Sequence, residues 1–420
     1  MEILPVRRLA IAGMLLFISA CAVSPASVLK GQGSWSSFQH DENSRSGEAA
    51  VVMHDGRVLL LGGNLRNGRP VATVEIYDPH HATWSTATDM PVAVNFPSVT
   101  VMADGRVLVA GGWVLKANTV VPVNTAFIFD PASGSWTKVA PMTQSRSMQS
   151  AVLLRDGRVL VAGGANASTE ITSSEIFNPA TGKWMKAANM PVDRGSALAI
   201  TLPDGRVFVT GGFSSAGSPP SSLYDPGANA WSTLKFPPTG YVVSSAFLNR
   251  AGQIVGFMHQ YQAPPNGESV PAPVDLIPFV FDLQTGVTRT GTAMPGGPSV
   301  TAFGPSGRDA VLMLDGKLLN FDGIRVLLYD PVGNNWTVAP SPPPISGIFG
   351  PTLIMLQDGR VLITSGDYFD LFDPNGVIVG PSPAFIGSPE LSWWLTVIAA
   401  LMIVLVGAQY AWSRRPQRAT

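Results

Sequence analysis

The chain has 420 residues, which is enough for one large domain or a few small ones. Charged residues make up only 13% of the sequence, whereas glycine (43) and proline (36) are abundant, a composition typical of many short buried strands joined by tight turns. The formal net charge is −1, and acidic residues outnumber basic ones between the two ends, so no nucleic-acid partner is expected.

Residues 1–20 have the layout of a secretory signal. Arg7 and Arg8 precede the apolar run Leu9–Ala20, which is too short to span a bilayer. Residues 18–21 resemble the lipobox of bacterial lipoproteins, which implies that Cys21 becomes the lipidated N-terminus of the mature protein. Ordinary cleavage is the alternative, because Ala20-Cys21-Ala22 also fits the small-residue rule for signal peptides. Either way, we expect an extracytoplasmic protein.

The stretch Ala151–Met190 contains a unit that repeats along the chain. Two apolar runs meet at Asp156-Gly157, and the second run ends at Gly163-Gly164. A polar loop follows, and then two more short runs around the turn-rich spacer 178–182. Asp-Gly between apolar runs predicts a hairpin, and we expect a type I′ turn, in which both central residues have a positive φ. The unit therefore predicts four short strands.

The same features recur with a period of about fifty residues. The Asp-Gly turn recurs at Asp55, Asp104, Asp204, Asp315 and Asp358, the glycine pair at Gly62, Gly111 and Gly211, and an aromatic-Asp-Pro segment before Trp84, Trp136, Trp231 and Trp336. In these features the chain resembles the kelch-repeat proteins over residues 33–380. The resemblance implies an all-β, kelch-type β-propeller of seven four-stranded blades. It implies no single activity, because propellers carry many unrelated functions.

The predicted blades follow one another along the chain. They are Ser46–Met90, Phe96–Met142, Ser147–Met190, Gly195–Phe236, Tyr241–Met294, Ser299–Ala339 and Gly350–Pro374. The fifth blade is degenerate, with Gly256-Phe257 in place of the glycine pair, and the last blade lacks a tryptophan. A strand around Trp35 can supply the missing outer strand, which closes the ring and removes open sheet edges. The alternative is that Val377–Val379 forms that strand.

The C-terminal part is predicted to anchor the protein in a membrane. Residues 381–390 form a linker, and Leu391–Trp412 carries no charge and, at ~1.5 Å per residue, is long enough to cross a ~30 Å hydrocarbon core. Aromatic residues cluster at both ends of this stretch, and the basic tail 413–420 follows, so the positive-inside rule predicts a cytoplasmic C-terminus. A buried globular helix is the alternative. The segment also weakly resembles exosortase sorting signals, although Leu391 replaces their second proline.

Three arginines occupy the same repeat position, ten residues before the hairpin aspartate: Arg45, Arg146 and Arg194. Tyr241 occupies this position in the fifth blade. Because the position precedes the first, innermost strand, these side chains are predicted to rim the mouth of the channel and to bind carboxylates or sugar hydroxyls. The alternative is that each arginine hydrogen-bonds loop carbonyls within or between blades. The loops 64–70, 113–122, 165–172 and 213–221 are expected to share in ligand binding.

Few residues suggest catalysis. The five histidines share no repeat position, and His80-His81 is expected to be a solvated turn rather than a metal site. Galactose oxidase has kelch blades and a copper site with a cysteine-linked tyrosine, but Cys21 is the only cysteine here and precedes the propeller. We therefore expect no metal, no cofactor and no enzymatic activity.

The leading prediction is a membrane-anchored, extracytoplasmic binding or scaffold module for a protein or glycan ligand. The alternative is a carbohydrate-active enzyme of the galactose-oxidase-like propeller type that lacks the copper-site cysteine. In a third interpretation the propeller only organises a membrane complex.

Overall fold

A computed structural model of the chain describes residues 33–39, 45–65, 67–215, 217–260, 275–295, 310–321, 325–340, 352–365 and 368–376. The chain divides into two units, Met1–Asn375 and Gly376–Thr420. The predicted signal peptide 1–20, Cys21, the linker 381–390, the apolar stretch Leu391–Trp412 and the tail 413–420 lie outside the described residues. The described residues contain no helix, so none of suitable length and hydropathy to cross a membrane is found among them.

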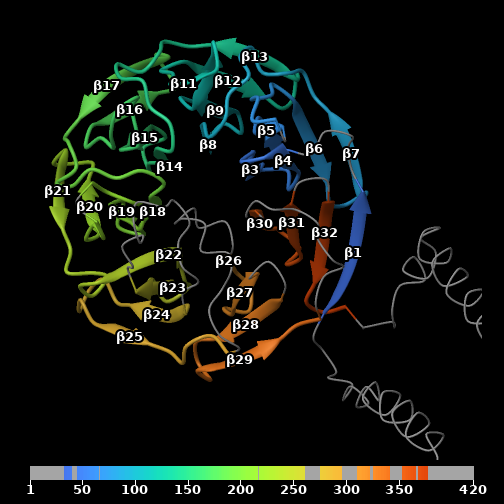
Figure 1. The fold of residues 1–420 in the computed structure, drawn as a ribbon, viewed down its shortest axis with the longest axis vertical. Helices are drawn as coiled ribbons and strands as arrows, with labels where there is room; N and C mark the ends of the chain where they lie inside the picture. The colour runs from blue at the N-terminus through green and yellow to red at the C-terminus, as the bar shows by residue number, and fades with distance from the viewer. Residues whose placement is uncertain are drawn as a thin grey trace, which may run out of the picture. The chain divides into compact units, whose positions relative to one another are not determined.

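Seven four-stranded antiparallel sheets, or blades, are arranged around one axis in the first unit (Figure 1). Blade one is β3 (Ala49–Val52), β4 (Val58–Leu61), β6 (Val74–Asp78) and β7 (Thr83–Thr86). Blade two is β8 (Ser98–Val101), β9 (Val107–Ala110), β12 (Ala126–Asp130) and β13 (Ser135–Lys138). Blade three is β14 (Ser150–Leu153), β15 (Val159–Ala162), β16 (Ser174–Asn178) and β17 (Lys183–Ala187). Blade four is β18 (Leu198–Thr201), β19 (Val207–Thr210), β20 (Ser222–Asp225) and β21 (Ala230–Thr233).

The remaining blades follow the same plan. Blade five is β22 (Tyr241–Leu248), β23 (Ile254–Gln260), β24 (Ile277–Phe281) and β25 (Thr288–Thr290). Blade six is β26 (Ala310–Leu312), β27 (Leu318–Phe321), β28 (Val326–Asp330) and β29 (Asn335–Val338). Blade seven is β30 (Thr352–Met355), β31 (Val361–Ser365), β32 (Tyr368–Asp373) and β1 (Ser34–Gln39). The first strand of each blade lies nearest the axis and contacts the first strands of its two neighbours. The predicted seven-blade propeller is therefore confirmed.

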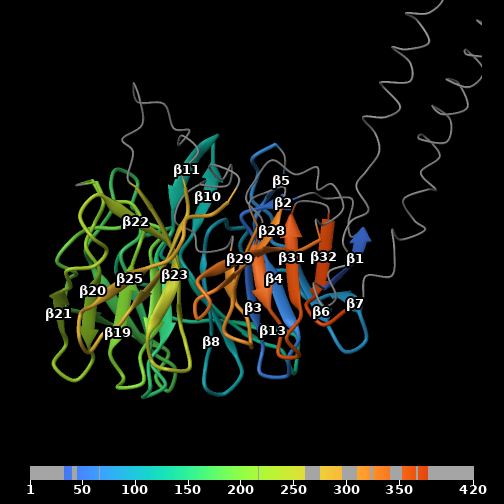
Figure 2. The same ribbon diagram turned by 90° about the horizontal axis from the view of Figure 1, so that it is seen from below.

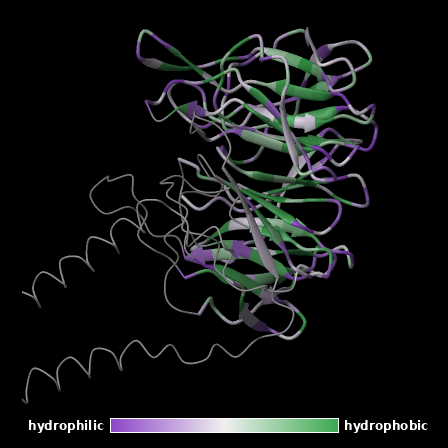
Figure 3. Cartoon of the chain, turned by 90° about the vertical axis from the view of Figure 1, so that its right-hand side faces the viewer, coloured by the Kyte–Doolittle hydropathy of each residue, from purple (hydrophilic) through white to green (hydrophobic). Residues whose placement is uncertain are grey.

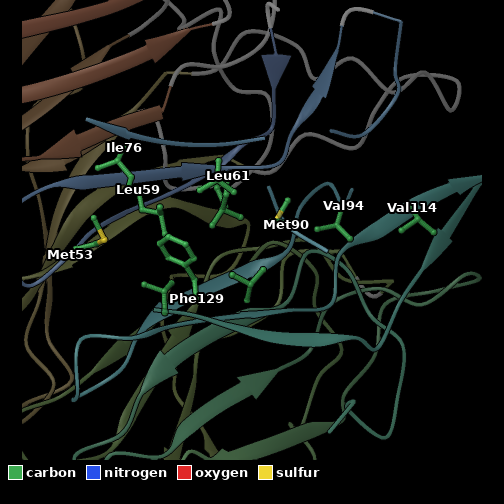
Figure 4. Packing of buried hydrophobic residues seen from close by; sticks show 12 residues of the cluster. Met53, Leu59, Leu61, Ile76, Met90, Val94, Val114 and Phe129 are labelled. Atoms are coloured by element: carbon green, nitrogen blue, oxygen red, sulfur yellow. The ribbon is translucent and has the colours of Figure 1, made fainter. Parts of the chain in front are cut away.

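The second strands are buried on both faces, because a neighbouring blade covers each side. Every residue of β4, β9, β15 and β19 is buried. Figure 4 shows one interblade core, in which Leu59 and Leu61 of blade one lie beside Phe129 of blade two. Side chains of this kind alternate between the two interfaces that flank a blade. Apolar residues accordingly concentrate within the strands rather than in the connecting turns (Figure 3).

The Asp-Gly hairpins form where they were predicted, but the expected turn type was wrong. In the first hairpin the Gly56 amide donates to the Met53 carbonyl (3.0 Å) and the Met53 amide donates to the Arg57 carbonyl (2.8 Å). Only the glycine of the Asp-Gly pair has a positive φ, +85°. The loop is therefore a three-residue turn closed by a left-handed glycine, not a two-residue type I′ turn. The Asp55 carboxylate accepts a hydrogen bond from the Arg57 amide (3.1 Å), which fixes the turn.

The recurring tryptophans lie on the outermost strands, where they join neighbouring blades. Each indole contacts an aromatic ring of its own third strand; the Phe129 and Trp136 ring centroids, for example, are 4.9 Å apart. The Trp136 indole N–H also donates to the Thr88 carbonyl of the preceding blade (2.8 Å). Trp184, Trp231, Trp336 and Trp35 make the corresponding bonds to Ala140, Ala188, Thr292 and Pro340. These rings are half-buried and link blades from the outside.

The N-terminal strand completes the last blade. β1 pairs antiparallel with β32, with Ser34 opposite Asp373 and Trp35 opposite Phe372. The predicted closure by the Trp35 strand is therefore confirmed, while the alternative strand Val377–Val379 lies outside the described residues. β32 thus has a hydrogen-bonded partner on both sides.

The two faces of the propeller differ. One face, here called the turn face, carries the tight turns between the first and second strands and between the third and fourth strands of each blade. The opposite face, here called the loop face, carries the segments after the glycine pairs and the segments that enter each new blade. These include the hairpin of β10 (Trp113–Lys116) with β11 (Thr119–Pro122) and the pair of β2 (Arg45–Ser46) with β5 (Asn64–Leu65) (Figure 2).

Candidate ligand-binding face

A cavity of about 510 Å³ lies on the axis, between the innermost strands of all seven blades. Its walls are mostly small and aliphatic, and Ser98, Gln149, Ser150 and Thr352 supply the polar side chains. Gln149 is turned into the wall, where its amide donates to the Ala110 carbonyl (2.7 Å) and to the Ser98 hydroxyl (3.1 Å). Among the described residues that line the cavity, none carries a carboxylate, imidazole, thiol or basic group. The described walls can therefore enclose water or a ligand.

Arg146 lies at the predicted repeat position but is completely buried. Its guanidinium donates to the carbonyls of Gly163 (2.9 Å) and Ser173 (2.8 Å) and to the Glu175 carboxylate (2.9 Å). Its own carbonyl accepts a hydrogen bond from the Gly112 amide (2.9 Å) of the preceding blade. Burial lowers the pKa of the guanidinium, although Glu175 opposes this effect. Arg146 therefore ties the glycine pairs of blades two and three together.

Arg194 makes the equivalent link between blades three and four. Its carbonyl accepts from the Gly164 amide (2.8 Å), and its guanidinium donates to the Gly211 (3.3 Å) and Pro220 carbonyls. Ser222 occupies the position of Glu175, so no buried carboxylate faces this cation. Burial accordingly lowers the pKa of Arg194 to about 10.

Two of the four predicted ligand-binding residues, Arg146 and Arg194, therefore do not contribute to an open rim. The side chains of Arg146 and Arg194 are directed into their own blades, which is the alternative arrangement considered from the sequence. Tyr241 begins β22, is half-buried, and accepts a hydrogen bond from Ser218 through its carbonyl. The backbone of Arg45 pairs with Leu65, while its side chain lies outside the described residues. The buried guanidiniums of Arg146 and Arg194 are therefore not accessible from this face.

The glycine pairs bring the segments of the loop face together. A β-carbon at Gly163 would lie 2.5 Å from the Arg194 carbonyl oxygen, and one at Gly164 would lie 2.6 Å from that of Ser147. Both glycines also have positive φ, +65° and +95°. Only glycine meets both requirements, so the segments that enter blades three and four cross directly over this pair.

Sequence reasoning missed the carboxylate that pairs with Arg146. Glu75, Glu175 and Asp370 occupy one position of the third strand, and all three are buried. The signal was available in the sequence, because an acidic residue within an apolar strand is rarely buried without a partner. Aligning the acidic residues as well as the arginines across the blades would have found it.

The described histidines do not form a metal site. His81 Nδ1 lies 2.8 Å from Asp78 Oδ2 in an exposed turn, and His259 is mostly buried in β23, where burial lowers its pKa. Within the described residues, no three His, Cys, Asp or Glu side chains come close enough together to hold a metal ion.

Comparison with known proteins places these observations in a family. A family model described as the kelch motif matches residues 45–91, 97–143 and 148–191. The chain is 28% identical over 165 residues to Kelch-like protein terF of Aspergillus terreus (37% of this chain, 36% of that protein). It is 29% identical over 131 residues to beta-scruin of Limulus polyphemus (30% and 14%) and 33% identical over 92 residues to the F-box/kelch-repeat protein At4g39580 of Arabidopsis thaliana (22% and 23%). The matched segments thus cover only a minor part of each relative.

Among solved structures, a fungal alcohol oxidase of the AA5 family in complex with copper superposes with a TM-score of 0.61 at 17% identity, covering 82% of this chain and 76% of that chain. This likeness concerns the fold alone.

The closed ring of seven four-stranded sheets defines a β-propeller. The glycine pairs, the spaced tryptophans and the matching motif model then identify the repeat. The chain is a kelch-repeat β-propeller.

Proposed function

We propose that the protein is a non-enzymatic binding module, held on the extracytoplasmic side of a membrane, whose loop face engages a protein or glycan. The kelch propeller itself supports a binding or scaffold role. The observation that carries the proposal is the contrast between the two parts of the molecule that a ligand can reach. The described walls of the axial cavity are mostly small and aliphatic and hold no titratable group, whereas the loop face presents exposed polar side chains and the ring of Phe213.

Membrane attachment in this proposal rests on the sequence. The uncharged stretch Leu391–Trp412 and the basic tail 413–420 supply the anchor, and Cys21 supplies a second, lipid-borne attachment. Removal of residues 391–420 should release a signal-bearing Cys21→Ala variant from the membrane fraction, and Cys21→Ala alone should leave the protein attached. Release by Cys21→Ala alone would contradict the role of the C-terminal stretch.

Crosslinking in intact cells tests the binding role. The full chain, carrying a photoreactive amino acid at an exposed position of the loop face such as Ser168, should yield a discrete adduct with a protein or glycan. The same group at Val332, an exposed position on the turn face, should yield none. An equal yield from both positions, or from neither, would refute the assignment of the loop face.

A further inference from the structure

Blades three and four present an exposed aromatic ring on the loop face. Phe213 directly follows the glycine pair of blade four and is 40% exposed. It is the only aromatic residue among the exposed large apolar side chains of the described residues. Its backbone is held by two hydrogen bonds with Gly195, of 2.9 and 3.0 Å. The backbone of Phe213 is therefore held in place, and its ring is not part of the buried interblade clusters.

A half-buried carboxylate lies beside this ring. A β-carbon at position 195 would be 3.1 Å from Cε2 of Phe213 and 3.7 Å from Cγ of Glu170, so both side chains cover the Gly195 backbone. Glu170 comes from the loop after the glycine pair of blade three, where its backbone bridges to Ala165. Within the part of the chain that the structure describes, its carboxylate has no hydrogen-bond or ion-pair partner. All its acceptor positions remain open to a ligand.

A second carboxylate orders the segment after Phe213. Asp193 accepts hydrogen bonds from the hydroxyls of Ser214 and Ser215, both at 2.8 Å, and from the Ser215 amide at 3.2 Å. Burial raises the pKa of Asp193, but these bonds outweigh it and leave the pKa below its ordinary value. Asp193 is therefore ionised at neutral pH and keeps this short loop rigid.

The adjacent cation, Arg194, attracts Asp193 electrostatically but is itself buried. Arg194 is 1% exposed, and its guanidinium already donates to Gly211, Pro220 and Ser222. The accessible groups are therefore one aromatic ring and two carboxylates. We call Glu170, Asp193, Gly195, Phe213 and Ser215 the Phe213 patch.

We propose that the Phe213 patch binds a lysine or arginine side chain of a partner protein. An aromatic face attracts a cation through its quadrupole, and an adjacent carboxylate adds a charge-assisted hydrogen bond. A guanidinium or ammonium group placed over Phe213 lies within reach of Glu170 and fills its open acceptor positions. An acidic ligand would instead meet two like charges. The inference rests on the proposed binding function and specifies the chemistry of the partner.

Binding of hexa-arginine to the full chain, purified in a mild detergent, tests the patch. Fluorescence anisotropy of the labelled peptide should show saturable binding that weakens as salt is raised. Phe213→Ala and Glu170→Gln should each weaken it by roughly tenfold. Val332→Ala and Asp225→Asn, which alter an exposed apolar residue and a carboxylate on the turn face, are the matched controls and should leave it unchanged. A thermal melt of each variant verifies that it is folded.

Three results of the binding assay would overturn the proposal. The first is hexa-arginine binding that Phe213→Ala and Glu170→Gln leave intact, and the second is equal weakening by the turn-face controls. The third is binding of a neutral oligosaccharide such as cellohexaose that is lost in Phe213→Ala, while hexa-arginine does not bind, because the patch would then serve a glycan.

In the intact-cell crosslinking, a protein adduct that persists in both patch variants refutes the patch but upholds the binding function. Failure of every loop-face probe refutes the binding function, while the peptide titration still decides the patch.

Discussion

At the residue scale, the two buried arginines show how one repeat position can carry different electrostatics. Arg146 faces the carboxylate of Glu175, which also accepts the amides of Thr143 (2.7 Å) and Gln144 (3.2 Å). Arg194 has only carbonyl and hydroxyl acceptors. Removing one partner of a buried ion pair is costly, because the other charge stays desolvated. The two arginines should therefore differ in how the fold tolerates their loss.

We expect Arg146→Met to lower the free energy of unfolding by about 3–5 kcal/mol, since Glu175 would remain buried without a counter-charge. The double variant Arg146→Met/Glu175→Gln should recover part of this loss, and Arg194→Met should cost less than Arg146→Met. Urea unfolding followed by tryptophan fluorescence measures all three variants. Equal losses for the two single variants would show that the carboxylate is not the deciding partner.

The turn aspartates should make the propeller sensitive to acid. The side-chain hydrogen bond from Arg158 lowers the pKa of Asp156, and Arg206 does the same for Asp204. A carboxyl whose pKa is depressed in the folded state stabilises it above the unfolded value, about 3.9 for aspartate, and this contribution is lost as the pH falls through the folded pKa. The melting temperature should therefore drop between pH 5 and the folded pKa values.

In the double variant Asp156→Asn/Asp204→Asn the melting temperature should fall less on acidification, because asparagine keeps the side-chain acceptor of the turn but does not titrate. Melting temperatures between pH 7 and pH 3 provide the comparison, expressed relative to each protein at pH 7. If the melting temperature of the double variant falls with pH as steeply as that of the unaltered protein, other carboxyl groups cause the acid sensitivity.

At the element scale, the glycine pair of a blade allows the chain segment that enters the next blade to pack closely against it. Gly163 and Gly182 both have a φ of +65°, but only Gly163 has a backbone oxygen within 4 Å of where a β-carbon would stand. The two positions therefore separate the effect of backbone strain from the effect of close packing.

Gly182→Ala should cost about 1–2 kcal/mol, the expected price of a left-handed alanine. Gly163→Ala carries the same strain and also forces the Arg194 carbonyl away, so we expect a clearly larger loss. Chemical denaturation of the two variants gives the difference directly. If Gly163→Ala costs no more than Gly182→Ala, the crossing segments are free to move apart.

The elements that could be predicted from the sequence are those formed by residues that are close together in the chain. Apolar runs meeting at Asp-Gly, as around Asp156, predicted the position of each hairpin, because those residues themselves make the turn. The turn type was not predictable, since Asp-Gly suits both a two-residue and a three-residue loop. The bonds from Arg146 to loop carbonyls were considered as an alternative, but its carboxylate partner was missed, because Glu175 lies 29 residues away. The loops 165–172 and 213–221 were expected to share in ligand binding, but the grouping of Glu170, Asp193 and Phe213 was not predicted, because three separate segments build it.

At the scale of the whole molecule, the ring depends on the junction between β1 and β32. Trp35 spans this junction, because its ring lies 4.9 Å from that of Phe372 and its indole donates to the Pro340 carbonyl of blade six (2.7 Å). Without β1, the strand β32 would present an unpaired edge to solvent, which promotes association with other chains.

Deletion of residues 33–39 should therefore lower the melting temperature and produce oligomers whose proportion rises with protein concentration. Trp35→Phe retains the strand and an aromatic ring but loses the indole hydrogen bond and part of the ring contact, so it should cost about 1 kcal/mol or somewhat more and remain monodisperse. Light scattering coupled to size-exclusion chromatography, with the undeleted chain as reference, distinguishes these outcomes. A deleted chain that elutes and melts like the reference would mean that β1 is dispensable for closure.

The pairing of β1 with β32 also has a consequence for biogenesis. β1 leaves the ribosome long before β32, with which it pairs. The nascent propeller therefore carries β1 unpaired until almost the entire ring has been made. The first six blades can form as they emerge, since each of them is built from contiguous residues. A product that terminates early therefore lacks the β1–β32 pairing, however many blades it has completed. The unpaired β1 distinguishes it from the finished protein for chaperones and proteases.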